Sequence, residues 1–310
     1  MGDNKVRFVA IGTRGSDLAL FQARHVSWLL QSANVELSVK VRTIVTSGDR
    51  ILDSPLAQIG DKGLFVKEIE NELLRGEVDL AVHSCKDLPT ELPEGLMIAA
   101  FSEREDPRDV FIGRAGSLDE LPQGARIGTS SLRRRSQLLS LRPDLEIVDI
   151  RGNVETRIRK IGEEGLHGTV LAAAGVKRLE REGDIGFYFP EDVMVPAVGQ
   201  GVIAVECRRS DNPVRQLLRL IDDSAARGAA LAERALLHEL EGGCQVPIGA
   251  HARVVDDRLK LDAYLGSLDG SRNVRMGHEG SVDDAAALGE ELAKRMLEAG
   301  GADILAQFRS

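Results

Sequence analysis

The chain has 310 residues, of which 43% are hydrophobic and 29% are charged, and its formal net charge at pH 7 is −9. These values are typical of a soluble globular protein with two or three domains. The acidic balance argues against nucleic acid or an anionic membrane surface as a partner. No apolar run is long enough to span a membrane and the first residues do not resemble a signal peptide, so we expect a cytoplasmic protein.

The cysteine content is low, with Cys85, Cys207 and Cys244 widely spaced along the chain. An odd number of distant cysteines favours reduced thiols, which again indicates the cytosol. The chain has no Cys-x-x-Cys pair and no His/Cys cluster, so we expect no metal site. Cys244 is unusual because it lies in the pliable stretch "LEGGCQVPIG" rather than in an apolar run.

Strand-like and helical segments alternate over the first 200 residues, which favours a parallel-rich α/β architecture. The expected strands lie in the segments 5–12, 35–45, 78–84, 95–101, 109–113, 125–128, 145–150, 168–174 and 200–206.

Four helices are expected between these strands. The first is capped by Ser16 and runs to about Ser32, the second covers 67–75 and is ended by Gly76, and two more begin near Leu132 and Asn153. The apolar face of the first helix is expected to consist of Leu18, Phe21, Val26, Leu29 and Leu30.

Two polar or Pro/Gly-rich segments, 101–109 and 191–201, are candidate hinge crossings between domains. If both are hinges, 106–196 forms an inserted α/β domain, and the first α/β domain is discontinuous. That first domain would consist of 1–101 and 201–221.

The C-terminal part, 224–310, is expected to be a separate α+β domain. It begins with a helix over 224–241 and continues with an antiparallel meander of strands at 247–255, 258–266 and 273–280. A helix from Asp283 to about Ala299 closes the domain, and Cys244 lies on the loop that enters the sheet.

Basic and hydroxyl side chains follow nearly every expected strand of the α/β part. Ligands of open α/β sheets bind at the carboxyl ends of the strands, so this pattern indicates a cleft for an anion with several charges. The alternative is that some of these arginines are ordinary solvated surface residues. The groups are Arg14 and Ser16; His83, Ser84 and Lys86; Thr129, Ser131, Arg133 and Arg134; Arg151 and Arg157; and Lys177 and Arg178.

Asp87 is an acidic residue within this basic pattern. It can act on a cation or transfer a proton, or it can be a helix-cap or turn residue before Leu88. The long segment 47–63, which includes Lys62, is either a mobile lid or an ordinary exposed loop.

Eight motifs occur in order along the chain. They are "GTRGSDLALFQA", "GDKGLFVKEIE", "AVHSCKDLPTELPEGL", "EREDPRD", "IGTSSLRRRSQL", "IRGNVETR", "PAVGQG" and "LEGGCQVPIG". Together they resemble the porphobilinogen deaminase family, over almost the whole chain.

The resemblance implies two domains like those of type II periplasmic binding proteins, joined by two hinge crossings, and a third domain with a cofactor cysteine. It implies a monomer that condenses four porphobilinogen molecules head to tail, with loss of ammonia, and releases hydroxymethylbilane. The primer is a dipyrromethane cofactor held through a thioether, which by motif is attached to Cys244. Cys207 is expected to be structural and Cys85 to be a space-filler.

The family's site residues carry over by motif. Asp87 matches the catalytic carboxylate, which is expected to stabilise a cationic azafulvene-type intermediate, and Arg14 and Arg151 match cations critical for catalysis. The resemblance assigns cofactor binding to Ser84, Lys86, Asp87, Thr129, Ser131, Arg133, Arg134 and Arg157. It assigns substrate binding to Arg14, Ser16, Gln22, Lys62, Arg151, Arg157, Arg178 and Gln200, of which Gln200 can instead serve the hinge.

The chain departs from the family pattern in the segment 47–63. Gln58 and Asp61 stand where relatives often have Lys and Gly, and Ser47 replaces a more usual basic residue. The less basic lid puts its role in gathering substrate in doubt.

Two other functions are possible. One is a non-enzymatic module that binds small anions, which would leave Cys244 and Asp87 without a role. The other is a thiol hydrolase that uses Cys244, for which no motif positions His238 or His251 as a base.

Overall fold

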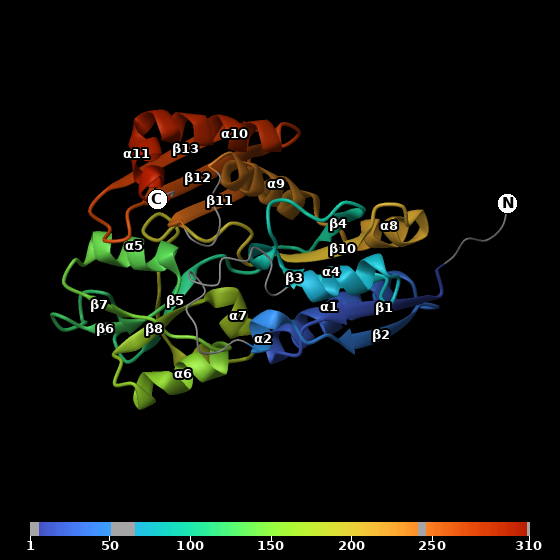
Figure 1. Ribbon diagram of the computed structural model, residues 1–310, viewed down its shortest axis with the longest axis horizontal. Coiled ribbons are helices and arrows are strands. Elements are labelled where there is room, and N and C mark those ends of the chain that lie inside the picture. The colour runs from blue at the N-terminus through green and yellow to red at the C-terminus, as the bar shows by residue number, and fades with distance from the viewer. Residues whose placement is uncertain (1–5, 51–65, 241–245, 309–310) are drawn as a thin grey trace. The chain divides into compact units, whose positions relative to one another are not determined.

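The computed structural model describes residues 6–50, 66–240 and 246–308 (Figure 1). These residues form two compact units. Unit 1 consists of 6–50, 66–104 and 202–227, and unit 2 consists of 105–201, 228–240 and 246–308. Unit 2 contains two of the three sheets. The three-domain boundaries expected from the sequence stay a prediction.

The sheet of unit 1 has five strands, and four of them run in one direction. β10 is the exception, because it pairs antiparallel with both of its neighbours, β3 and β4. The order across the sheet is β2 (Ser38–Thr43), β1 (Phe8–Thr13), β3 (Leu80–Ser84), β10 (Ile203–Arg208) and β4 (Leu96–Phe101).

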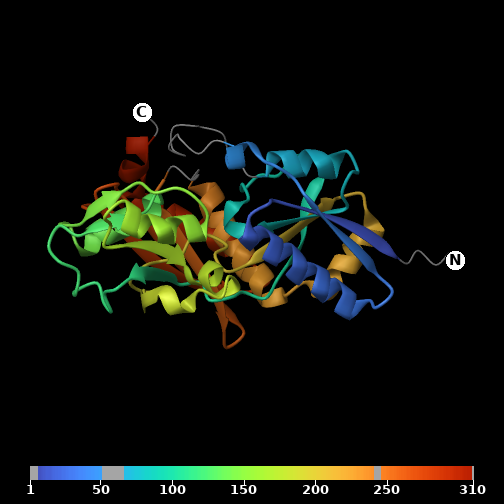
Figure 2. The same ribbon diagram turned by 90° about the horizontal axis from the view of Figure 1, so that it is seen from below.

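Helices cover both faces of this sheet. Helix α1 (Asp17–Ala33) and helix α8 (Asn212–Leu218) pack against the face formed by Val9, Leu80 and Val205, whereas α4 (Lys67–Leu74) packs against the face that includes Ala81. Figure 2 shows α1 and α4 on opposite sides of the strands. Alternate residues of each strand therefore enter two separate cores. The short α2 (Ser47–Arg50) follows β2.

Helix α1 begins where the sequence predicted. The hydroxyl of Ser16 accepts a hydrogen bond from the backbone N–H of Ala19 at 3.3 Å, which satisfies one otherwise unpaired donor of the first turn. The predicted apolar face is wrong in part. The buried residues are Ala19, Gln22, Ala23, Val26 and Leu30. Phe21 is 38% exposed because its side chain points away from that stripe.

The first sheet of unit 2 repeats the strand order of unit 1. Its antiparallel strand is β5, which pairs with β8 and β9. β5 and β10 occupy equivalent positions, and each strand directly follows one of the two crossings. The order is β7 (Glu146–Val148), β6 (Arg126–Gly128), β8 (Gly168–Ala172), β5 (Asp109–Gly113) and β9 (Ile185–Tyr188).

The helices of this sheet are α5 (Leu132–Leu141), α6 (Val154–Glu163) and α7 (Ala173–Arg178). The sequence predicted the starts of α5 and α6, and the side chains of Ser131 and Asn153 cap them. The predicted strand 168–174 is too long, because the chain turns into α7 after Ala172. The sequence reading missed β9 and α8.

The C-terminal sheet is antiparallel, as predicted. It consists of β11 (Ile248–Val255), β12 (Arg258–Gly266) and β13 (Asn273–Ser281). Asp256 and Asp257 form the first turn with φ values of 49° and 59°, which is the conformation that tight hairpins need. The core beneath the C-terminal sheet includes residues of α9 (Ser224–Glu239) and α10 (Ala285–Met296). The short α11 (Ala302–Leu305) follows α10 in the chain.

The predicted fold class is thus confirmed: two mixed α/β sheets covered by helices and one C-terminal antiparallel sheet. In the part of the chain that the structure describes, none of the helices has the length and apolar character needed to cross a membrane.

Candidate functional site

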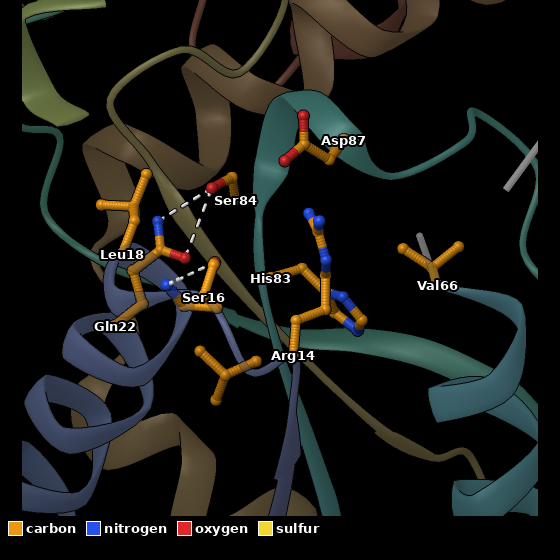
Figure 3. Close-up of a pocket in the computed structure, with 10 residues that line it drawn as sticks. Arg14, Ser16, Leu18, Gln22, Val66, His83, Ser84 and Asp87 are labelled. Carbon is orange, nitrogen blue, oxygen red and sulfur yellow. Dashed lines mark hydrogen bonds between the residues drawn. The ribbon is translucent and has the colours of Figure 1, made fainter. Parts of the chain in front are cut away.

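A pocket in unit 1 lies where β1 and β3 end (Figure 3). These two strands are parallel neighbours, so the residues that follow them meet at one edge of the sheet. The pocket is lined by Arg14, Ser16, Leu18, Ala19, Gln22, Val66, Val82, His83, Ser84 and Asp87. The structure therefore brings together five of the site residues that the sequence predicted, namely Arg14, Ser16, Gln22, Ser84 and Asp87.

The turn between β1 and α1 is held by short-range hydrogen bonds. The buried hydroxyl of Thr13 donates to the carbonyl of Ala19 at 3.2 Å, and Ser16 caps the helix from the opposite direction. Arg14 lies between these two anchors. Its backbone is therefore fixed, while its long side chain extends into the pocket.

Gln22 positions Ser84. Its amide Nε2 donates to the hydroxyl of Ser84 at 2.8 Å, and Gln22 itself is 2% exposed. A buried amide needs such a partner. The hydrogen bond also joins α1 to the end of β3, which fixes one wall of the pocket (Figure 3).

Asp87 is the last residue of the short 3-10 turn Cys85–Asp87 and is exposed. A capping role would require its carboxylate to accept a backbone N–H. Among the described residues, no hydrogen bond or ion pair involves that carboxylate, and the turn is closed instead by the backbone bond from Leu88 to Cys85. In Figure 3 the guanidinium of Arg14 extends toward it. These features favour the functional interpretation of Asp87 over the structural one.

The neighbours of Asp87 differ in their environment. Cys85 is 1% exposed, and its backbone N–H donates to the carbonyl of Val202 at 2.9 Å, which fits a space-filling role. Lys86 is half-buried. Cys207 is buried within β10, and burial raises the pKa of its thiol to about 11, so it is protonated at neutral pH.

Unit 2 places a second group of predicted residues at the carboxyl end of β6. Thr129 is buried, and its hydroxyl accepts from the backbone N–H of Ser131 at 3.2 Å. Ser131 accepts in turn from the N–H of Arg134 at 3.4 Å and caps α5. Two hydroxyl groups thus lie at a helix N-terminus, where the helix dipole favours negative charge.

Arg133 and Arg134 were predicted to bind cofactor carboxylates, and the structure gives both a carboxylate within the protein. Each is 5% exposed, and each has a guanidinium nitrogen 2.7 Å from an oxygen of Asp109. The two cations hold the pKa of Asp109 far below its usual range despite its burial. Asp109 was not among the predicted site residues, although it is the last residue of the quoted "EREDPRD" motif and the first residue of β5.

Three other predicted arginines contact backbone or lie half-buried in unit 2. Arg157 donates from Nε to the carbonyl of Gly152 at 2.9 Å, and Arg178 donates from Nη2 to the carbonyl of Gly201 at 2.8 Å. Burial lowers the pKa of Arg178 to about 10, so it keeps its charge at neutral pH. Arg151 is half-buried.

The two crossings lie side by side. The backbone N–H of Glu105 donates to the carbonyl of Gly201 at 3.2 Å. The amide of Gln200 donates to the carbonyl of Pro107 at 2.7 Å and to Asp109 at 3.0 Å. These contacts favour the hinge role of Gln200. Lys177 also supports this region, since its ammonium lies 3.3 Å from a carboxylate oxygen of Glu105.

Two predicted site residues lie outside the described residues. They are Lys62, expected at the tip of a lid, and Cys244, expected to carry the cofactor. Gln58 and Asp61 fall in the same undescribed segment as Lys62.

Two family profiles match the chain. One is described as "Porphobilinogen deaminase, dipyromethane cofactor binding domain" and covers residues 9–216, and the other is described as "Porphobilinogen deaminase, C-terminal domain" and covers residues 228–298. The protein named porphobilinogen deaminase in Syntrophomonas wolfei is 54% identical over 305 residues, which is 98% of this chain and 100% of the relative. The protein of the same name in Geobacter sulfurreducens is 52% identical over 307 residues, 99% of this chain and 96% of the relative.

Among solved structures, a TRAP periplasmic solute binding protein from Desulfovibrio salexigens is similar with a TM-score of 0.42 and 12% sequence identity. The match covers 71% of this chain and 72% of the other. The two family profiles and the curated relatives span nearly the full length of the chain. The chain belongs to the porphobilinogen deaminase family.

Proposed function

We propose that the protein condenses four porphobilinogen molecules head to tail on a covalent dipyrromethane primer, with release of ammonia and of the linear tetrapyrrole hydroxymethylbilane. The observation that carries this proposal is Asp87. In a chain of the porphobilinogen deaminase family, its exposed carboxylate lines a pocket together with a cation, Arg14, and is bound to no other described residue.

The positive charge of Arg14 suits the carboxylates of the substrate, and the negative charge of Asp87 suits the cation that forms in the reaction. Porphobilinogen carries two carboxylates, which an arginine fork pairs with directly. Loss of ammonia leaves positive charge on the pyrrole, and a fixed carboxylate stabilises that charge as it develops. We therefore assign Arg14 to substrate binding and catalysis and Asp87 to stabilising the reacting ring, with Ser16 and the Gln22–Ser84 pair fixing the wall around them.

The residues of unit 2 fit a ligand with several carboxylates. The hydroxyls of Thr129 and Ser131 lie at the N-terminus of α5. Arg133 donates from Nη1 to Asp109 and to the carbonyl of Val195. A guanidinium has five N–H donors, so Nε and Nη2 of Arg133 add three more. We propose that these groups, with Arg134, Ser84, Lys86, Asp87 and Arg157, hold the dipyrromethane cofactor. When bound, the cofactor supplies the pyrrole carbon to which the first substrate is joined, and Cys244 holds it through a thioether.

We propose that Lys62, Arg151, Arg157, Arg178 and Gln200 take part in binding the substrate and the growing chain. Arg151 is the second catalytic cation in this proposal. The protein is further expected to be cytoplasmic, which the free, buried thiols of Cys85 and Cys207 support. It is also expected to be a monomer, as the family resemblance implies.

The test compares wild type with Asp87→Asn, assayed for both ammonia release and bilane formation. We expect turnover to fall by about 10²–10³, the usual effect of removing one preorganised electrostatic group. Glu94→Gln is the matched control, because it makes the same carboxylate-to-amide change at an exposed position of the same loop, and we expect it to retain activity.

The outcomes separate this proposal from the binding-module alternative. Wild-type protein that binds porphobilinogen but releases no ammonia would be a binding module. Wild-type activity in Asp87→Asn would contradict the catalytic role of Asp87.

A further inference from the structure

Three ionisable side chains lie buried together behind the pocket of unit 1. Glu70 of α4 is 5% exposed, His83 of β3 is 5% exposed, and Glu206 of β10 is fully buried. Nε2 of His83 lies 2.9 Å from Oε2 of Glu206. Fully buried charged residues are rare unless they are paired, so two carboxylates that share one imidazole require an explanation.

The strand register explains why these groups meet. Ala81 of β3 pairs with Glu206, and His83 pairs with Ala204. Side chains of a strand alternate between faces, so Ala81, His83 and Glu206 share the face that α4 covers. Glu70 adds its carboxylate from α4, on the same side of the helix as the buried Ile69 and Leu73. The cluster is thus fixed by tertiary structure.

The cluster has fewer hydrogen bonds than it has polar atoms. Among the described residues, neither oxygen of Glu206 nor Oε1 of Glu70 has a hydrogen-bond partner, and the contact of His83 with Glu206 is an ion pair by distance without hydrogen-bond geometry. Two buried carboxylates without sufficient donors cannot both ionise easily. Burial raises the pKa of Glu70 to about 7, with Glu206 raising it further and His83 opposing the shift.

Other charged groups on the surrounding elements have different partners or positions. Glu72 and Arg208 pair with residues outside the cluster, and Lys67 is exposed at the start of α4. The charged groups that line the pocket are Arg14 and Asp87. The charged residues on the elements around the cluster are Lys67, Glu68 and Glu72 of α4, Arg208 of β10, Lys40 and Arg42 of β2, Asp79 before β3 and Arg14 after β1.

His83 connects the cluster to the pocket. Its ring lines the pocket alongside Arg14, and its Nε2 contacts Glu206 on the buried side. Val66, the residue before α4, lines the pocket as well. A change of charge in the cluster therefore changes the electrostatic potential in the pocket, because the side chain of His83, rather than solvent, separates Glu206 from the pocket.

We propose that Glu70, His83 and Glu206 form a proton-holding cluster that sets the electrostatic potential at Arg14, with His83 as a positioning residue for substrate binding. This inference rests on the proposed function. While Glu70 keeps its proton, the negative charge of the cluster is smaller and Arg14 attracts a substrate carboxylate more strongly. Loss of that proton adds one negative charge behind Arg14 and weakens the attraction.

The kinetic test measures KM for porphobilinogen at pH 6.5 and pH 8.5. The carboxylic acid and amine groups of the substrate do not titrate between these values, so a change reports on the protein. We expect KM of the wild type to rise by about threefold to tenfold, the effect of one charge at moderate distance in a partly screened site. Glu70→Gln removes the titrating group and should abolish the rise.

Glu72→Gln is the matched control, because Glu72 lies on the same helix but pairs with Arg42 and is partly exposed. It should keep the rise. A rise of the wild-type size in Glu70→Gln, or no rise in the wild type, would overturn the proposal.

A second readout does not depend on activity. The imidazole carbon signal of His83, assigned by comparison with His83→Gln among the six histidines, should shift near pH 7 as Glu70 loses its proton, and this shift should be lost in Glu70→Gln. A His83 signal with the same pH dependence in both proteins would refute the cluster. If the protein formed no bilane, the proposed function would fail, while this signal would still decide whether the cluster exists.

Discussion

The first sheets of the two units share one strand order, and each carries a buried carboxylate on its antiparallel strand. In unit 2 this residue is Asp109, which has two guanidinium partners at 2.7 Å. In unit 1 it is Glu206, which has one imidazole and faces a second carboxylate, Glu70. The equivalent strand therefore carries a fully paired carboxylate in one unit and an incompletely paired one in the other.

This difference in pairing distinguishes charged residues that stabilise the fold from charged residues that can bind a ligand or take part in a reaction. The Asp109 network ties α5 to β5 and contacts Gln200 in the crossing. In unit 1, the residues after the strands keep their charged ends in a pocket, and Asp87 is bound to no other described residue. The pairing of a buried charge thus indicates its role better than its position does.

Breaking the network of unit 2 should have the largest effect on stability. Asp109→Asn leaves two buried guanidinium groups without a counter-charge, which typically costs about 3–5 kcal/mol. Urea unfolding at pH 7 measures the loss. Asp262→Asn, which breaks the exposed pair with Arg253, should cost less than about 1 kcal/mol, and equal losses in the two variants would contradict the comparison.

The incompletely paired carboxylates of unit 1 should make stability depend on pH. The pKa of Glu70 is raised in the folded state from 4.5 to about 7, so the folded protein binds more protons than the unfolded chain between these values. Stability from this group is therefore complete below pH 4.5 and is lost as pH rises through 7. The shift corresponds to about 3 kcal/mol.

The measurement compares the free energies of unfolding at pH 5 and pH 8 for the wild type and Glu70→Gln. The variant should lose less stability than the wild type over this interval, because its amide does not ionise. An identical loss in both proteins would show that Glu70 ionises normally in the folded state.

The helix caps should give the smallest effects and sharpen the comparison between the units. Ser16→Ala and Asn153→Ala each remove an N-cap side chain, and each should cost about 1 kcal/mol in urea unfolding. Ser16 also lines the pocket, so only its substitution should also raise KM for porphobilinogen. A raised KM in both variants, or in neither, would argue against a specific role for Ser16.

The sequence predicted well the features that depend on neighbouring residues. Helices were expected to begin after Ser16 and near Leu132 and Asn153, and the side chains of Ser16, Ser131 and Asn153 cap these helices. The three strands of the C-terminal sheet were also expected, because their alternation and turn residues are local signals. The error at Phe21 arose because several apolar stripes fit one helix until its packing partner is known.

The buried charge clusters could not be predicted in the same way. Asp109 of β5 meets Arg133 and Arg134 of helix α5, and Glu206 meets His83 across more than a hundred residues of chain. The partner of a charged residue in a strand can be identified only when the strand order is known. The antiparallel position of β10 supplies that partner, and no local pattern reveals it.

The most direct test of the proposed function is the intact mass of the purified protein under denaturing conditions, followed by peptide mapping. The account predicts an excess equal to two porphobilinogen units less the ammonia lost, located on the peptide that contains Cys244 and missing from Cys244→Ser. A bare mass that gains the excess on addition of porphobilinogen would show that the protein was purified without its cofactor. A mass that stays bare after that addition would contradict the attachment to Cys244 and, with it, the proposed reaction.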